Sequence, residues 1–382
     1  MSRDDPRGPD VHVVALPRPD HLPDGTGSDD DVAARRFAAA AVLAARVSRH
    51  LWGDGDHALE PVEQLALAAD TDAEQWRGWV AIEAASGGDD VVGLLTATLP
   101  LRDNLTTAYV EVAVDPDRRR RGIATALLAV AERELTAAGR SVLLSWSEEP
   151  GAGPWERTIP ARSGTGGMPA TAPTEAFARA RGFELEQAER LGRLDVPLPP
   201  DDPRWALAPG ITGERRGPDG DYTIVDWVGR CPEHLLDDYA QLKIAISTDI
   251  PTADLDQEAE VWDAHRIRED DDLVIARGGQ RLTAAVRHRP TGRLVGHTVL
   301  ERYAPRPAVA EQEDTLVLAA HRGHRLGMLL KLHNLRRLEA TWPEVRRVYT
   351  WNAQENTPML DINLALGFGQ AGVVGAWQKR LR

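Results

Sequence analysis

The chain has 382 residues, of which 42% are hydrophobic and 27% are charged. That length exceeds what one hydrophobic core usually organises, so two domains of an ordinary globular protein are expected. The formal net charge of −14 argues against a nucleic-acid partner, which selects a basic surface, and mildly favours a cationic or amine-bearing partner.

Two further features bear on location. Cys231 is the only cysteine, so no internal disulfide can form and a cytoplasmic location is expected. No run of about 18 apolar residues occurs, so the sequence predicts no membrane span.

The first half of the chain alternates short apolar runs with helical patterns. The stretch 149–173 is rich in Gly, Pro, Ser and Thr and predicts a long loop, and prolines between 197 and 203 indicate a linker. Strands are expected over residues 11–16, 79–83, 91–98, 109–114, 141–146 and from 183 to about 196, and helices over 31–51, 123–138 and 174–181.

The second half repeats this order. The charged run 258–272, which includes His265, is interpreted as a solvated helix, and no metal is expected. Strands are expected over residues 222–228, 282–287, 294–301, 315–318, 348–351 and after 368, and helices over 232–246, 326–339 and 358–366.

Matching residues recur at one spacing. An offset of 203 relates Gly93 to Gly296, Glu111 to Asp314, Arg119 to Arg322 and Leu127 to Leu330. The pair Gly182-Phe183 matches Gly367-Phe368 at an offset of 185, and the loop at 149–173 accounts for the difference. The chain is therefore predicted to contain two copies of one domain, over residues 1–200 and 205–382.

Each copy has a basic, glycine-containing turn between a strand and a helix. Arg119-Arg120-Arg121-Gly122-Ile123-Ala124 forms the first turn and Arg322-Gly323-His324-Arg325-Leu326-Gly327 the second. Backbone N–H groups at such a turn have no helical carbonyl to bond, so they can hold a pyrophosphate together with the helix dipole. Arg325 stands where the first copy has Gly122, and its guanidinium could either reach a phosphate or crowd the turn.

These residues carry a resemblance to a known family. Val114-x-Pro116-x-x-Arg119-x-x-Gly122-x-Ala124 resembles motif A of the GNAT acetyltransferase superfamily. Asn356-x-x-Met359-x-x-x-Asn363-x-x-x-Gly367-Phe368 is similar to its motif B. The resemblance covers residues 75–196 and 280–382.

The resemblance implies a mixed α/β (α+β) chain of two tandem GNAT-like domains. Each would have a central, mostly antiparallel sheet, flanked by helices, that splays open between its fourth and fifth strands. The implied activity is N-acetyl transfer from acetyl-CoA directly to an amine, with a small amine-bearing substrate and no nucleic acid or membrane as partner. A monomer or a homodimer is expected.

The resemblance also implies which residues bind acetyl-CoA. In the second copy, Asn352 and Asn356 could hydrogen-bond its pantetheine arm, although Asn356 could instead cap the following helix. The remaining positions are Val114, Arg119, Arg120, Arg121, Gly122, Ile123 and Ala124 in the first copy, and Val317, Arg322, Gly323, His324, Arg325, Leu326 and Gly327 in the second.

Asp314, Glu111 and Asn363 are the candidate catalytic positions. Asp314 and Glu111 occupy matched strand positions near where such folds place a general base, but each could also be a solvated residue or an arginine partner. The family's thiolate-protonating tyrosine would fall at Asn363 and at Ala178, and neither side chain is an acid. The C-terminal copy is favoured as the catalytic one because its motif B is intact.

Two other functions stay open. The missing tyrosine would suit a CoA-binding scaffold or sensor that does no chemistry. Aminoacyl transfer from tRNA is performed by some tandem GNAT-like proteins, but the net charge of −14 counts against tRNA binding.

Overall fold

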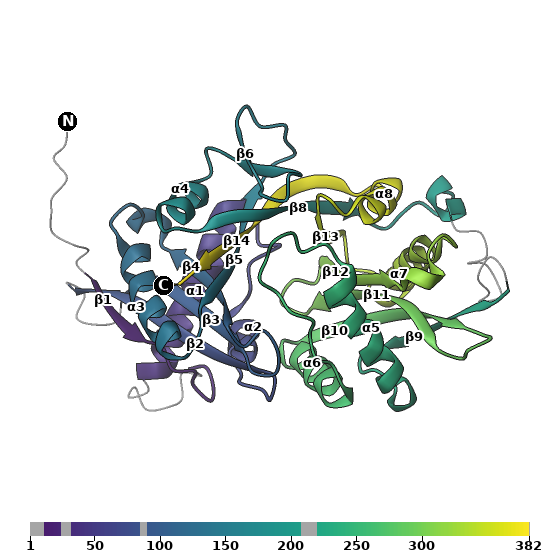
Figure 1. Cartoon of the computed structure of the whole chain (residues 1–382), viewed down its shortest axis with the longest axis horizontal. Helices are drawn as coiled ribbons and strands as arrows, with labels where there is room; N and C mark the ends of the chain where they lie inside the picture. Colours follow the sequence, from purple (N-terminus) through teal and green to yellow (C-terminus); the bar gives the residue numbers. More distant parts are fainter. Residues whose placement is uncertain (1–10, 24–31, 85–89, 208–219, 382) are drawn as a thin grey trace. The chain divides into compact units, whose positions relative to one another are not determined.

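A computed structural model describes residues 11–23, 32–84, 90–207 and 220–381, and its chain forms two compact units (Figure 1). Unit 1 comprises Met1–Ser147, Pro173–Glu184 and Trp377–Arg382, and unit 2 comprises Glu148–Ala172 and Leu185–Ala376. Each unit therefore takes more than one segment of the chain. Strand β14 (Gly369–Arg380) begins in unit 2 and ends in unit 1.

Unit 1 contains strands in the order β1-β2-β3-β4-β5. They are β1 (Val11–Ala15), β2 (Glu74–Glu83), β3 (Val91–Pro100), β4 (Thr107–Val114) and β5 (Val142–Pro150), the last of which runs on into unit 2. The helices are α1 (Val32–Trp52), α2 (Pro61–Leu67), a 3-10 turn (Pro116–Arg118), α3 (Ile123–Ala137) and α4 (Pro173–Ala180).

Unit 2 contains strands in the order β8-β13-β12-β11-β10-β9. They are β8 (Glu184–Asp195), β9 (Tyr222–Val228), β10 (Gly279–His288), β11 (Leu294–Tyr303), β12 (Val309–Val317) and β13 (Arg347–Ala353), with a small hairpin of β6 (Thr158–Pro160) and β7 (Gly167–Pro169). The helices are α5 (Leu236–Asp249), α6 (Ala264–Ala276), α7 (Leu326–Thr341) and α8 (Thr357–Ala365), with 3-10 turns at Pro203–Leu207, Glu233–Leu235 and Ala319–His321.

Alternation along the strands explains the layers of unit 2. On β10, Leu282, Ala284 and Val286 belong to the core that includes the buried leucines of α7. The intervening Ala285 belongs to a second core that includes Tyr239 of α5 and residues of α6. Because successive strand residues point to opposite faces, α7 covers one face of the sheet while α5 and α6 cover the other. Among the described residues, no helix is long and apolar enough to cross a membrane.

Both sheets open between two parallel strands. In unit 1, β4 pairs with β5 only from Thr107 to Tyr109, and in unit 2, β12 pairs with β13 only from Val309 to Gln312. The pairs β1–β2, β2–β3 and β3–β4, and their counterparts in unit 2, are antiparallel. The predicted mostly antiparallel sheet that splays between its fourth and fifth strands is thus confirmed.

The expected elements differ from the structure in a few places. Strand β12 begins at Val309, six residues before the expected strand, because its first half carries the polar run Glu311-Gln312-Glu313-Asp314 that hides a strand pattern. The stretch expected to be a long loop contains the hairpin β6–β7. Helix α5 begins at Leu236, since Glu233–Leu235 form a 3-10 turn. Asp31, the expected start of the first helix, lies outside the described residues.

The two basic turns share one backbone conformation. Gly122 has φ 80° and Arg325 has φ 55°, and each immediately precedes its helix. Two residues earlier, Arg120 has φ 65° and Gly323 has φ 86°. Both positions are therefore left-handed in both copies. Glycine occupies the position next to the helix in unit 1, and the position two residues earlier in unit 2. A non-glycine residue in this region costs roughly 1–2 kcal/mol, so each turn retains one strained arginine.

We expect Gly122→Ala to lower the free energy of unfolding by about 1 kcal/mol, because alanine must adopt the left-handed conformation that glycine takes freely. Urea denaturation would measure the change. Gly55→Ala is the control, since this glycine has no left-handed φ and an added Cβ would make only an ordinary contact, with Arg49 Nε at 3.9 Å. Its effect should stay within about 0.5 kcal/mol. Equal effects of the two substitutions would contradict the assignment of strain to the turn.

Helix α7 buries a lysine. Lys331 is 1% exposed and its ammonium lies 5.8 Å from the centre of the Phe368 ring. Burial lowers the pKa of Lys331 to about 7. An unfolded chain would hold that proton up to a pKa of about 10.4, so the unfolded state binds more protons between these values and the free energy of unfolding rises with pH across that window.

Lys331→Met should therefore increase the free energy of unfolding at pH 7 on the order of 3 kcal/mol, and the gain should shrink as pH approaches 10. Urea denaturation of both proteins at several pH values between 7 and 10 measures the difference. Parallel pH curves for the two proteins would show that the lysine is not desolvated.

Candidate functional site

The turn of unit 2 presents backbone donors at the start of α7. The side chain at the N-cap position, Arg325, makes no capping hydrogen bond, and the first intrahelical bond is donated by Leu329 N to Arg325 O at 3.0 Å. Arg322 stabilises the turn, because its Nε donates to Val317 O at 2.9 Å and its guanidinium pairs with Asp249 at 2.7 Å. The free N–H groups and the helix dipole fit a phosphate group.

The turn of unit 1 has the same geometry with different support. Its helix N-cap is Gly122, without a side chain to cap α3. Arg118 Nε lies 3.4 Å and Arg121 3.9 Å from Glu83 Oε1. Ile123 is buried, as is its counterpart Leu326 of unit 2. The side chains of these last two residues are core residues, so they can meet a ligand only through their N–H groups.

Strand β12 contains a β-bulge beside the opening in the sheet. Its register with β11 shifts by one residue between Thr298↔Thr315 and Leu300↔Gln312. The amide of Gln312 supports the bulge, donating to Val299 O at 2.6 Å and to Thr298 Oγ1 at 3.0 Å. The bulge directs two successive acids, Glu313 and Asp314, into one cavity. In unit 1, β3 and β4 pair without a shift over Gly93–Thr98.

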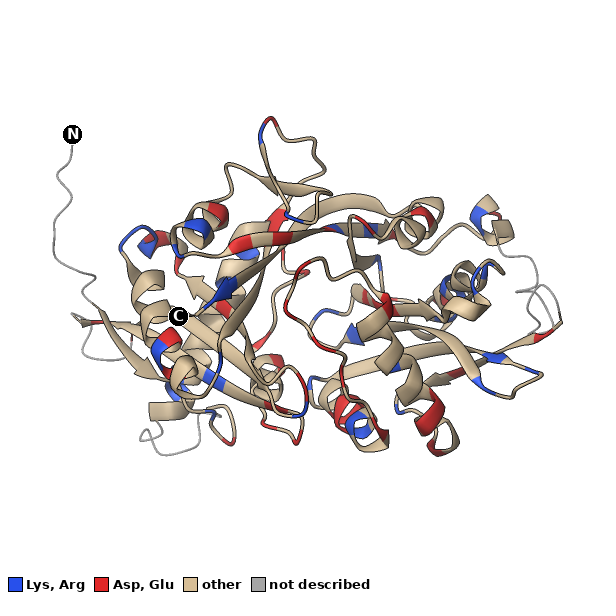
Figure 2. Ribbon diagram, viewed as in Figure 1, with Lys and Arg blue, Asp and Glu red and all other residues tan. Residues whose placement is uncertain are grey.

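That cavity has a volume of about 240 Å³ and lies between α5, α6 and strands β10 to β12. Its walls carry both acids and bases, and the α6 helix that borders it carries residues of both charges (Figure 2). The lining residues are Tyr239, Lys243, Asp270, Leu273, Val274, Arg277, Arg281, Val299, Glu301, Glu313 and Asp314.

Asp314 forms an ion pair with Lys243. The Lys243 Nζ to Asp314 Oδ2 distance is 2.5 Å, and the ammonium also lies 4.6 Å from the centre of the Trp262 ring. Burial alone would raise the pKa of Asp314, but the Lys243 charge outweighs it and the pKa is lowered. The pKa of Lys243 is raised, because Asp314 and Asp270 outweigh its burial. Asp314 is therefore a carboxylate held by its partner.

Glu313 lies in the opposite electrostatic situation. Burial of its carboxyl, followed by the charges of Glu301, Glu311 and Asp314, raises the pKa of Glu313 well above its ordinary value. Solvent still reaches the side chain, as expected for a residue on a cavity wall. A carboxyl with a raised pKa in a cleft is suited to accept a proton near neutral pH. The residue pattern indicated its neighbour Asp314 but not Glu313, since a bulge leaves no trace in that pattern.

Glu111 of unit 1 is the counterpart of these acids. Its side chain is exposed on β4, yet the protein around its carboxyl desolvates the charge and raises the pKa of Glu111. It has no neighbouring bulge. Leu94, on the adjacent strand β3, is a buried core residue, whereas the matched position in unit 2 is His297.

The predicted asparagines of unit 2 lie on strand β13 and on helix α8. Asn356 is the N-cap of α8 and accepts a hydrogen bond from Met359 N at 3.4 Å. Asn363 is buried and donates to Asn352 Oδ1 at 2.5 Å. Asn363 of α8 therefore supports Asn352 on strand β13, and its amide has no acidic proton to give a thiolate.

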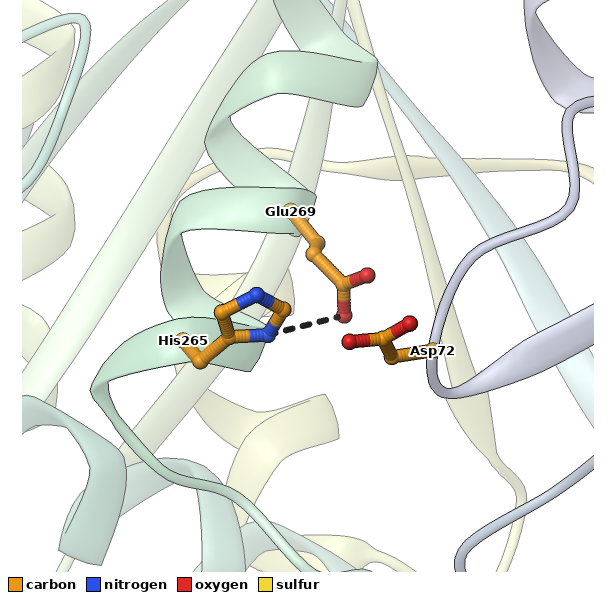
Figure 3. A group of neighbouring side chains, drawn as sticks. All are labelled: Asp72, His265 and Glu269. Atoms are coloured by element: carbon orange, nitrogen blue, oxygen red, sulfur yellow. Dashed lines mark ion pairs between the residues drawn. The ribbon is translucent and has the colours of Figure 1, made fainter.

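Histidines surround the second turn. His324 packs 5.4 Å from the centre of the Tyr222 ring, and His321 Nδ1 lies 3.1 Å from the Tyr222 hydroxyl. On α6, His265 Nδ1 lies 3.7 Å from Glu269 Oε2 one turn along the helix (Figure 3). This spacing is that of an ordinary i,i+4 pair on a helix. The solvated helix expected over residues 258–272 is only partly correct, because α6 begins at Ala264 and packs Ile267 into the core.

Comparison with known proteins places the fold. Residues 45–151 match the model of the acetyltransferase (GNAT) family. A tandem GNAT protein from the clavulanic acid biosynthesis pathway has a TM-score of 0.71 at 27% identity, over 97% of this chain and 99% of that one. A GCN5-related N-acetyltransferase from Sphaerobacter thermophilus has a TM-score of 0.56 at 12% identity, over 95% and 98%. A comparison with curated proteins finds no sequence match.

The fold and these similarities define the chain as an N-acetyltransferase of the GNAT type. It is a tandem GNAT protein, with two such domains in one chain, as the repeated motif predicted. Proteins of this family generally transfer an acyl group from an acyl-CoA such as acetyl-CoA.

The Lys243–Asp314 pair generates a stability prediction. Lys243→Met leaves the half-buried carboxylate of Asp314 without its partner and should cost about 1–3 kcal/mol of unfolding free energy, whereas the double variant Lys243→Met/Asp314→Leu should recover most of that loss. Urea denaturation of the wild type, both single variants and the double variant measures the coupling. If the two losses simply add, the pair has no coupling energy and does not hold Asp314.

Proposed function

We propose that the chain transfers the acetyl group of acetyl-CoA directly to the amine of a small molecule, and that the reaction takes place in unit 2. The observation that carries this proposal is the bulge in β12. It brings an acid with a raised pKa, Glu313, to a cavity at the point where β12 separates from β13.

The chain's residues fit acetyl-CoA. The uncapped start of α7 and the turn at Arg322–Arg325 would hold the pyrophosphate, and Arg322 would keep the turn in place through Val317 O. Asn352, held by Asn363, would face the pantetheine arm. When bound there, acetyl-CoA supplies the thioester whose acetyl group moves to the amine.

Glu313 has the role of proton acceptor. An ammonium cannot attack a thioester, so the acceptor must first lose a proton to a base within hydrogen-bonding reach. Asp314, the base suggested by sequence, is occupied by Lys243 and has a lowered pKa, which makes it the weaker base. Glu313 accepts the proton directly or through one water molecule, and Asp314 with Lys243 fixes the bulge beside it.

Strand β12 would also stabilise charge on the thioester oxygen. Beyond Gln312 it has no β13 partner in register, so N–H groups on that open side of the strand can donate to an oxygen that becomes negative. The same opening in the sheet thus supplies both the space for the thioester and the donors that it needs.

A small acceptor agrees with two observations. The cavity of about 240 Å³ is smaller than the roughly 300–1,000 Å³ of pockets that take drug-sized ligands. The tandem GNAT protein from the clavulanic acid biosynthesis pathway comes from a pathway that makes a small molecule, and we infer an acceptor of similar size for this chain.

The decisive experiment measures thiol release from acetyl-CoA with a panel of small amines. Glu313→Gln should lower kcat/KM about 10²–10⁴-fold, the usual loss when a general base is removed. Glu111→Gln, the matched change in unit 1, should leave kcat/KM within about threefold of the wild type if the chemistry takes place in unit 2. The wild-type kcat/KM should rise with pH through the raised pKa of Glu313, because only its deprotonated form accepts a proton.

Two other outcomes of this experiment would contradict the proposal. Loss of activity in Glu111→Gln with full activity in Glu313→Gln would assign the reaction to unit 1. Binding of acetyl-CoA without thiol release across the whole panel would instead indicate a CoA-binding scaffold.

A further inference from the structure

Two cationic side chains in the cavity of unit 2 are already paired with acidic side chains of the protein. Arg281, 6% exposed, donates to Glu301 Oε1 at 2.7 Å, to Asp270 Oδ2 at 2.9 Å and to Asp271 Oδ1 at 3.2 Å. Three carboxylates thus surround one guanidinium. Lys243 is paired with Asp314 in the same cavity.

The third base of the cavity is also engaged. Arg277 donates to the Tyr303 hydroxyl at 2.7 Å, and its guanidinium lies 3.9 Å from the centre of that ring. Tyr303 in turn donates to Glu301. The cations of the cavity are therefore committed to acids or rings of the protein, which leaves them poorly placed to recognise a carboxylate of a ligand.

Glu313 is the acid on which negative charge remains in excess. Its charged neighbours Glu301, Glu311 and Asp314 are paired with Arg281, Arg306 and Lys243, whereas Glu313 forms no ion pair among the described residues. An unpaired carboxylate beside other acids is unfavourable, and a bound cation relieves the repulsion.

A second observation points to a ligand independently of these acids. His297 on β11 is 0% exposed, and neither of its ring nitrogens has a hydrogen-bond partner among the described residues. Its ring packs edge-on against Tyr239, a lining residue, with the ring centres 5.1 Å apart. Burial lowers the pKa of His297 to about 4, so the ring is neutral and one nitrogen can accept a hydrogen bond from an N–H donor.

Unit 1 lacks the arginine, histidine and glutamate of this cavity at the matched positions. An offset of 203 places Gly78 opposite Arg281, Leu94 opposite His297 and Thr98 opposite Glu301. Leu94 is part of the apolar core of that unit. A buried polar group without a partner is costly, so its presence in one copy alone indicates a use that the other copy lacks.

We propose that the acceptor is a small primary amine that binds in this cavity as a cation and carries no carboxylate group. Its ammonium lies against Glu313, with N–H donors available to His297. The inference rests on the proposed function, because it names the class of amine that the same site takes. Alkyl amines and diamines belong to this class, whereas α-amino acids do not.

Cadaverine and lysine test the proposal, because they differ only by the α-carboxylate. Isothermal titration of the full chain without acetyl-CoA should give at least tenfold tighter binding of cadaverine than of lysine. Glu313→Gln should weaken cadaverine binding at least tenfold and leave acetyl-CoA binding unchanged. Asp237→Asn, which removes one exposed charge from the first turn of α5, is the matched control and should bind cadaverine as the wild type does.

A second variant separates binding from folding. His297→Leu takes the residue of the first copy and removes a buried polar group, so it should raise the urea midpoint while weakening cadaverine binding at least threefold. Lysine binding as tightly as cadaverine, no binding of either amine, or unchanged cadaverine binding in Glu313→Gln would overturn the inference. Thiol release measured in parallel keeps the two proposals distinct, since acetylation of lysine in preference to cadaverine would uphold the transferase and reject the cationic acceptor.

Discussion

The separation of two parallel strands is the constraint on which the site depends. A sheet gains stability from every backbone pair, yet β12 and β13 stop pairing after Gln312 although both strands continue. The unpaired stretch leaves donors and space in the interior, where backbone groups normally bond to each other. The bulge in β12 lies at this interruption, and the strand continues from there to the turn before α7, so the proposed reaction depends on an incomplete sheet.

The two units share one part of this arrangement and differ in another. Both retain the interrupted parallel pair and the left-handed turn before the helix. Among the described residues, only unit 2 combines them with a bulge in the strand that precedes the turn, a supporting glutamine and a charged cavity. The turn tolerates exchange of glycine and arginine between its two left-handed positions, since its function resides in backbone N–H groups that any residue supplies.

The residue pattern was sufficient for the fold and for the turns, because both depend on properties that recur at a fixed spacing. The constant offset from Gly93 to Leu127 identified the repeat, and strand, turn and helix followed from apolar periodicity. The site was harder to read. The bulge displaces Glu313 relative to a regular strand. Lys243 lines the cavity from a helix distant in sequence, and His297 packs against the lining residue Tyr239. Contacts of that kind depend on packing, which no local pattern encodes.

The shared strand β14 bears on how the chain is made. Unit 1 contains Trp377–Arg382, whereas the whole of unit 2 lies between the segments that build unit 1. A ribosome therefore finishes every residue of unit 2 before it delivers the final strand segment of unit 1. The unit whose synthesis starts first is completed last, and until then its sheet has an open edge that could pair with another chain. Folding during synthesis would thus run from the second unit back to the first.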